Sequence, residues 1–462
     1  MRILWILLAS LLLSSCSIPK PLIERIKEEG QLVVITRNNP TTYIKEGDTI
    51  QGLEYELVEG FAAELGVTVK YVILDSFDEI LPAIVRGDAH FAAAGLTVTS
   101  SRELAVRFTP EYQTVTAQLV YKGGNPRPKA ITDTVDGVLE VVAGSSHEEQ
   151  LEQLLLEYPE LSWTAQRGVE STELLNLVYE GLIDYTIANS NEVALARRFH
   201  PELRVAFELG DEMPLAWAFP HAEDNSLYKA AKAYIRRIKE DGSLEQLLER
   251  YYGYVEKLGF VDNRTFARHM VQRLPPLIPL FKQAAEENDM DWQLLAAIGY
   301  QESHWNPEAV SPTGVKGIMM LTNATAKQMG VEDRTDTAQS ISGGARYLRR
   351  IEKKLPERIQ EPDRTWMALA GYNVGFGHLE DARILTQRGG GDPDKWADVK
   401  QYLPLLAQKK YYKTVKHGYA RGKEPVHYVD NIRSYYDLLV WHNRKQKKKT
   451  THAVIETLPA AL

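Results

Sequence analysis

The stretch DWQLLAAIGYQES, residues 291–303, decides how the C-terminal part of the chain folds. Asp291 is a good helix N-cap, and Leu295 and Ile298 recur at the spacing of one helical face. Glu302 lies four residues after Ile298 and continues this apolar stripe. A carboxylate on a buried face is costly unless it is partnered or protonated, and desolvation raises its pKa towards the range of a general acid. The spacing alone equally allows a Glu at a frayed helix end that turns to solvent.

The residues around this helix indicate an all-α domain. From about residue 266 to residue 441, long helical patterns and Gly-containing loops replace strands, and Trp and Tyr are frequent. Residues 267–462 carry 29 Lys and Arg against 22 Asp and Glu, whereas the rest of the chain carries 25 against 40. The positive balance would draw this part to an anionic polymer, and the alternative is simple surface solvation.

The segment from about residue 31 to residue 257 has an α/β pattern instead. At 462 residues, with 44% hydrophobic and 25% charged residues, the chain has the composition of a soluble globular protein with more than one domain. Strands alternating with helices predict a parallel or mixed sheet covered on both faces. We expect two lobes, about 31–122 plus 216–257, and 123–215. Strands are expected at 32–35, 67–72, 89–94, 137–144 and 185–188, and helices at 53–65, 80–85, 173–179 and 227–252.

The N-terminus indicates export. Residues 3–13 form an apolar run that is shorter than the ~20 residues needed to span a bilayer and fits the core of a signal peptide. The sequence LSSC that follows resembles the lipobox of bacterial lipoproteins, which implies cleavage before Cys16 and lipidation of its thiol. The alternative is an ordinary signal peptide with a chance cysteine. Ser17, by resemblance to lipoprotein sorting, implies the periplasmic face of the outer membrane.

Cys16 is the only cysteine of the chain, which excludes an internal disulfide and a Cys-based zinc site. We therefore expect a lipoprotein-type signal peptide over 1–16 and a tether over 17–30. The Lys-rich end, 446–462, is expected to be a basic and flexible tail.

Four ordered motifs extend the interpretation of Glu302. They are ES at 302–303, SPTGVKGIMML at 311–321, AGYNVG at 370–375 and YV at 428–429. In this order and spacing they resemble the motifs of lytic transglycosylases, over about residues 275–440. The resemblance implies a lysozyme-like fold of the goose type, a catalytic domain over 266–445, and cleavage of the glycan strands of peptidoglycan.

The resemblance also implies roles for single residues. Glu302 matches the catalytic acid/base, and Ser311 matches the serine that contacts the substrate near the reacting N-acetyl group. Tyr372 and Asn373 match the floor of the cleft, and Tyr428 matches a second cleft tyrosine. For both tyrosines the alternative is core packing.

Met320 departs from the usual pattern, since many relatives have Gln there. The Met-Met-Leu version resembles the membrane-bound lytic murein transglycosylase F branch, so the glycan contact at Met320 is in question. The motifs contain no second acidic residue, and Glu308 follows Pro307 where we expect it to be exposed. Most glycosidases use two carboxylates, but substrate-assisted ones do not.

The mechanism of the resembled family needs one carboxylate. It implies that Glu302 protonates the glycosidic oxygen while the acetamide of N-acetylmuramic acid stabilises the developing cation. Glu302 then takes the proton of the C6 hydroxyl, and a 1,6-anhydro ring closes. We expect no metal and no cofactor.

The N-terminal part resembles periplasmic solute-binding proteins that bind polar amino acids. The matching stretches are GLEYEL at 52–57, GLTVTSSR at 95–102 and GSS at 144–146. In relatives the residue that matches Arg102 pairs with the α-carboxylate of the ligand, and a guanidinium fork suits a carboxylate. Thr97 lies in the same stretch and is a further candidate. The alternative for Arg102 is a structural ion pair.

Four further residues complete the predicted ligand site. Ser145 and Ser146, at a helix start, offer hydroxyls and free N–H groups to an anion. Tyr43 lies where relatives often have an aromatic ring over the ligand side chain. Asn189 stands where relatives commonly have the Asp that binds an α-ammonium group. This favours an acylated ligand, such as a muropeptide fragment, over a free amino acid. A purely structural role for Asn189 is an even alternative.

These predictions together describe an outer-membrane-anchored lytic transglycosylase. A ligand that closes the lobes could regulate access to Glu302, and we keep this as a hypothesis because it requires two states with different affinities. The alternatives are a hydrolytic muramidase, and a solute-binding sensor lipoprotein whose C-terminal domain only grips glycan. The modest positive balance and the export signal argue against a nucleic-acid partner.

Overall fold

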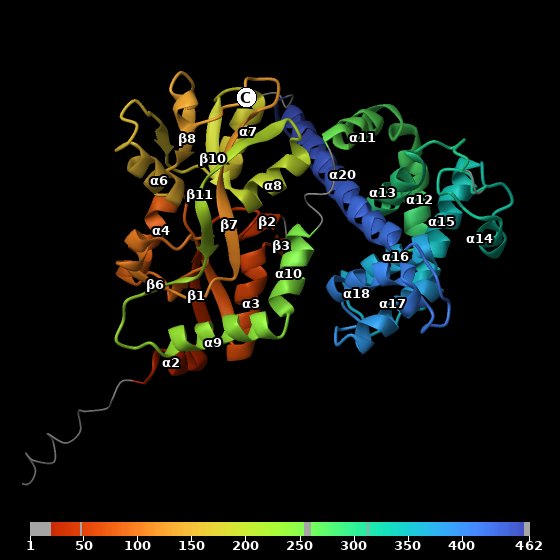
Figure 1. Cartoon of the computed structure of the whole chain (residues 1–462), viewed down its shortest axis with the longest axis horizontal. Coiled ribbons are helices and arrows are strands. Elements are labelled where there is room, and N and C mark those ends of the chain that lie inside the picture. The colour runs from red at the N-terminus through yellow and green to blue at the C-terminus, as the bar shows by residue number, and fades with distance from the viewer. Residues whose placement is uncertain (1–19, 47–48, 254–259, 312–313, 457–462) are drawn as a thin grey trace, which may run out of the picture. The chain divides into compact units, whose positions relative to one another are not determined.

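A computed structural model describes residues 20–46, 49–253, 260–311 and 314–456 (Figure 1). The predicted signal peptide and Cys16 lie outside these residues. The chain divides into two compact units, Met1–Val193 with Val205–Leu244, and Ala194–Arg204 with Glu245–Leu462. Among the described residues, no helix has both the length and the apolar character needed to cross a membrane.

The first unit contains a five-stranded sheet of order β4-β1-β5-β12-β6. β1 is parallel to β4 and β5, and β12 is antiparallel to β5 and β6. The predicted helix over 53–65 is confirmed as α3, which ends at Gly66 in the left-handed conformation. The elements of this lobe are β1 (Gln31–Thr36), β2 (Ile44–Glu46), β3 (Thr49–Gln51), α3 (Leu53–Leu65), β4 (Thr68–Ile73), α4 (Ile80–Arg86), β5 (Phe91–Ala92), α5 (Ser100–Glu103), β6 (Val106–Phe108), β12 (Ala218–Pro220) and α9 (Ser226–Glu240).

A second sheet, of order β11-β7-β10-β8-β9, forms the other lobe. β7 pairs antiparallel with β10. The chain therefore enters this lobe near residue 113 and not at 123 as the sequence suggested, because Ala117 and Leu119 are buried in its core. The elements are β7 (Gln113–Lys122), β8 (Leu139–Val142), α6 (Ser146–Leu154), β9 (Thr164–Gln166), α7 (Ser171–Glu180), β10 (Tyr185–Asn189), α8 (Ser190–Phe199) and β11 (Leu203–Leu215).

The second unit is helical, and α13 and α16 both pack against α20. Its core includes Phe281, Leu295, Ile298 and Met319, all fully buried. Outside isolated bridges, its described residues from Glu245 onwards contain no strand, as the sequence predicted. The helices are α11 (Phe260–Gln272), α12 (Ile278–Glu287), α13 (Trp292–Ser303), α14 (Asn323–Gln328), α15 (Thr337–Glu352), α16 (Asp363–Val374), α17 (Phe376–Arg388), α18 (Trp396–Tyr402), α19 (Lys409–Tyr412) and α20 (Lys423–Glu456).

Three segments differ from the sequence-based boundaries. Part of the expected tether is α2 (Leu22–Glu29), because its apolar stripe buries Ile26. α10 (Ser243–Tyr252) enters the helical unit, where the carboxylate of Glu249 pairs with Lys400 and, at 3.3 Å, with Arg433. α20 continues to Glu456 through much of the expected flexible tail, since Lys, Arg and Gln are good helix formers.

Candidate active site

α13 places Glu302 at the edge of the helical core. Asp291 caps the helix, since its carboxylate accepts the N–H of Gln293 at 2.7 Å. The helix ends at His304, which has a left-handed φ of 53°. Leu295 and Ile298 are fully buried, and Glu302 follows on the same stripe with a partly buried side chain. The predicted helix is confirmed, and Glu302 does not turn fully to solvent.

A tyrosine from α20 holds the Glu302 carboxyl group. The Tyr428 hydroxyl donates to Oε1 of Glu302 at 2.5 Å. Burial raises the pKa of Glu302 to about 7, against which this hydrogen bond acts. Glu302 can therefore hold a proton or lose it near neutral pH, as an acid that later acts as a base must do.

Aromatic rings surround the carboxyl group. The rings of Tyr372 and Tyr428 stack with centroids 6.4 Å apart, and Tyr347 of α15 contacts Tyr372 edge-on at 5.1 Å. The Tyr372 hydroxyl donates to the carbonyl of Met319 at 3.2 Å. Burial raises the pKa of Tyr372 and of Tyr428 well above the ordinary value, so both hydroxyls stay protonated. Sequence reasoning missed Tyr347, because no motif marks it.

The turn after α13 depends on a glycine. Ser303 of α13 donates to the carbonyl of Ile318 at 2.9 Å, which ties the helix end to this turn. Gly317 has a φ of 82°, and a Cβ there would lie 1.8 Å from the carbonyl oxygen of Arg334. Met320 has a left-handed φ of 46°. The turn motif at 311–321 thus fixes the position of the Met319 carbonyl, which accepts the hydrogen bond of the Tyr372 hydroxyl.

The structure also describes the other predicted residues. The Ser311 hydroxyl accepts the N–H of Val315 at 3.2 Å. Asn373 is exposed, one position after Tyr372, and Glu308 is exposed as expected. The substrate contacts of Ser311, Met320 and Asn373 stay predictions, whereas the structure brings Glu302, Tyr372 and Tyr428 together.

Comparison with known proteins explains both parts of the chain. Residues 32–254 match the family model of bacterial extracellular solute-binding proteins, family 3, and residues 279–393 match that of the transglycosylase SLT domain. A relative from Ectopseudomonas mendocina (strain ymp), named membrane-bound lytic murein transglycosylase F, is 49% identical over 95% of this chain and 91% of its own length. A relative of the same name from Saccharophagus degradans is 47% identical over 95% and 88%.

The chain belongs to the membrane-bound lytic murein transglycosylase F family. Among solved structures, the P235GK mutant of ArgBP from T. maritima is similar to the present chain. The similarity covers 50% of the present chain and 99% of the ArgBP chain. The identity is 22% and the TM-score 0.46. The two-lobed α/β fold of the N-terminal part and the helical fold of the C-terminal part agree with the two matched family models.

The N-terminal part of this family member contains a second candidate site, where Arg102 is bound by acceptors of the protein itself. Its Nε donates to Glu149 at 2.8 Å and one terminal nitrogen donates to the carbonyl of Gly144 at 2.9 Å. The other terminal nitrogen donates to the hydroxyl and the carbonyl of Thr97. The Arg102 side chain is only 3% exposed. Glu149 thus supplies the carboxylate that the resemblance assigned to a ligand.

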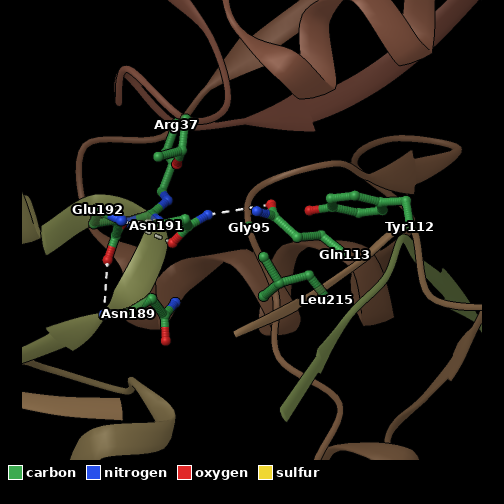
Figure 2. A pocket seen from close by; sticks show the side chains of 9 residues that line it. Arg37, Gly95, Tyr112, Gln113, Asn189, Asn191, Glu192 and Leu215 are labelled. Atoms are coloured by element: carbon green, nitrogen blue, oxygen red, sulfur yellow. Dashed lines mark hydrogen bonds and ion pairs between the residues drawn. The ribbon is translucent and has the colours of Figure 1, made fainter. Parts of the chain in front are cut away.

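Arg37 forms a second set of ion pairs between the lobes. Its terminal nitrogens donate to Glu170 and Glu192, each at 2.7 Å, and its Nε donates to the carbonyl of Ala94. Figure 2 shows Arg37 and Glu192 beside Asn189 and Asn191 in the hollow that they line. As far as the described residues show, this hollow has no room for a water molecule. The motifs missed Arg37, although a lone cation directly after β1, at the carboxyl end of a parallel strand, could have pointed to it.

The remaining predicted ligand residues are buried. Tyr43 packs against Tyr71 with ring centroids 4.9 Å apart. Ser145 caps α6, and Ser146 is its first residue. Asn189 Oδ1 lies 3.1 Å from a ring nitrogen of His147, a buried partner that the sequence did not suggest. Their contacts with a ligand stay predictions.

Proposed function

We propose that Glu302 performs both proton transfers of a lytic transglycosylase reaction. Membership of the family makes the chain a peptidoglycan lytic transglycosylase. The observation that carries the assignment of Glu302 is its desolvated carboxyl group, with a pKa of about 7, held by Tyr428. One group can then serve as acid in the first step and as base in the second.

The proposed steps follow from this geometry. Tyr428 engages Oε1, so the other carboxyl oxygen carries the proton towards the glycosidic oxygen. As the C1–O bond of N-acetylmuramic acid breaks, this proton passes to the leaving sugar and the substrate's acetamide stabilises C1. The Glu302 carboxylate then takes the proton of the C6 hydroxyl, whose oxygen bonds to C1 and forms the 1,6-anhydro ring.

The charges around Glu302 support a mechanism with one carboxylate. The causes that shift the pKa of Glu302 are burial and the Tyr428 hydrogen bond, with no contribution from another acidic group of the described residues. A second carboxylate in direct contact with Glu302 would raise that pKa further by repulsion. The reaction products distinguish the proposal from a two-carboxylate hydrolase.

Mass spectrometry of the products tests the function. With purified sacculi, we expect fragments with 1,6-anhydromuramic ends, one water lighter than the products of hydrolysis. Reducing ends that incorporate ¹⁸O from labelled water would instead show a muramidase, and intact sacculi would favour the glycan-gripping sensor.

The proposal for the N-terminal part is a site for a carboxylate ligand, either a muropeptide or an amino-acid-like compound. Such a ligand would displace Glu149 from Arg102. We expect Glu149→Gln to tighten binding of an N-acetylmuramyl peptide by about 10-fold, because the competing charge is removed. Calorimetric titration measures this, and Glu152→Gln, an exposed change on the same helix, is the matched control.

Equal or weaker binding by Glu149→Gln would contradict the proposed site. Regulation is tested with the same compound, since it requires a different rate of sacculus digestion when the N-terminal site is saturated. An unchanged rate, with binding shown separately, would exclude regulation by that compound.

Membership of a membrane-bound family indicates that the chain associates with a membrane. We attribute this association to lipidation of Cys16 and propose the periplasmic face of the outer membrane. Cys16→Ala should move the protein from the outer-membrane fraction to the soluble fraction. If the variant stays in the membrane fraction, another segment provides the attachment.

A further inference from the structure

A hollow of about 380 Å³ in the helical unit is lined almost only by cations. We call it the basic hollow. Its lining has no acidic residue, although Glu352 and Asp289 pair with the lining residue Arg349, and its volume is in the range of sites for small ligands. It is lined by Asn288, Arg346, Arg349, Arg350, Lys353 and Lys354.

Two of these cations form a fixed wall. The Nε of Arg346 donates to the carbonyl of Met329 at 3.0 Å, and the Nε of Arg349 donates to the carbonyl of Asn288 at 2.7 Å. Arg349 also pairs with the buried Glu352 at 2.9 Å and with the exposed Asp289 at 3.7 Å. These contacts orient the guanidinium groups before any ligand arrives.

The rim consists of three exposed cations, Arg350, Lys353 and Lys354. Within the described residues, none of them forms an ion pair. Arg350 lies in the last turn of α15, and Lys353 and Lys354 directly follow that helix, so the three like charges gather at its C-terminal end. An unbalanced cluster of this kind is typical of an anion site.

Helix capping does not explain the cluster. Lysines near a helix end often bind its last carbonyls. Here Arg364 already donates to the carbonyls of Glu352 and Leu355, at 2.7 and 3.1 Å. The helix dipole also attracts Lys353 and Lys354 to the C-terminal end of α15. This attraction explains the two charges but does not explain why they line a hollow.

The basic hollow lies close to the aromatic group around Glu302. Arg350 is one helical turn after Tyr347, whose ring contacts Tyr372. Lys354 Nζ lies 5.2 Å from the ring centroid of Phe376, which directly follows the AGYNVG motif. A polymer that occupies the site at Glu302 is thus within a few side chains of the rim.

We propose that the basic hollow binds a carboxylate of the short peptides that the glycan strand of peptidoglycan carries. The inference rests on the proposed function, because it places peptide-bearing glycan at Glu302. Planar guanidinium forks match carboxylates, and the ammonium groups of the rim add charge attraction. The hollow selects strands that still bear peptides over bare glycan.

Binding measurements separate this inference from the catalytic proposal. In a Glu302→Gln background, which requires no turnover, Arg350→Ala/Lys353→Ala/Lys354→Ala should bind peptide-bearing strands about 10-fold more weakly. Strands stripped of peptides by an amidase keep only the lactyl carboxylate on the muramic acid itself, and their binding should not change. The control Lys327→Ala/Lys409→Ala/Lys413→Ala removes the same charge from exposed positions outside the hollow and should leave both affinities unchanged. Thermal melts confirm that the variants fold.

Equal losses on both kinds of strand, or no loss on either, would overturn the inference. Sedimentation with phosphatidylglycerol vesicles tests a lipid phosphate as the anion. If the hollow variant loses vesicle binding but keeps its preference for peptide-bearing strands, the carboxylate assignment is wrong. A failure of the catalytic proposal would be seen in a different measurement. The chain with native Glu302 would then release no anhydro-ended fragments from sacculi.

Discussion

Glu302→Gln should lower the rate of peptidoglycan cleavage by at least about 10³-fold, the largest effect expected of any substitution in the chain. The amide keeps the shape of the side chain but can neither give nor take the proton. Release of anhydro-ended fragments from sacculi, followed by mass spectrometry, measures the loss. If Glu302→Gln digests sacculi at more than a few per cent of the native rate, another group is the acid.

The pH dependence gives an independent check. Since the acid step needs protonated Glu302, kcat/KM should fall as pH rises through about 7. Because the folded state raises the pKa of Glu302 from 4.5 to about 7, the native chain loses stability as pH rises from about 4.5 to about 7. At pH 8 the Gln variant should therefore be more stable than the native chain by about 2 kcal/mol. At pH 4 the two should melt alike, which shows that an inactive variant is not an unfolded one.

A residue of this site could be predicted from the sequence where a local pattern, such as one helix or one motif, determines its position. The helix that carries Glu302 could be predicted from its N-cap and apolar stripe, but the spacing alone left the direction of the side chain open, and the ordered motifs decided it. Tyr428 lies 126 positions away, and only the ordered motifs linked the two. Tyr347 carries no motif and joins the group only through the packing of α15 on α16, which no local pattern encodes.

The N-terminal part shows the same division. Its alternation of strands and helices predicted two lobes, and Arg102 was identified from a motif. Its partner was not, because Glu149 lies 47 positions away and belongs to a different lobe. The lobe boundary at 122 was also wrong, since β7 follows the first sheet in sequence but pairs with β10 in the second. Pairing between distant segments decides these features.

Gly317→Ala should cost about 4 kcal/mol or more in the free energy of unfolding, measured by urea denaturation. The new Cβ would lie 1.8 Å from the carbonyl oxygen of Arg334, which is backbone and cannot rotate away. The turn must then shift, and with it the Met319 carbonyl that accepts the Tyr372 hydroxyl. We therefore expect cleavage to fall together with stability.

Gly314→Ala is the matched control, because Gly314 has the same φ of 82° but open space around its Cα. It bears only the strain of a left-handed alanine, about 1–2 kcal/mol. The difference between the two variants isolates the clash from the backbone strain. Similar losses of unfolding free energy for both variants would mean that the turn tolerates displacement. Glycine would then be required at position 317 only because of the positive φ. A large difference would instead show that close approach of the Arg334 backbone fixes the turn beside Glu302.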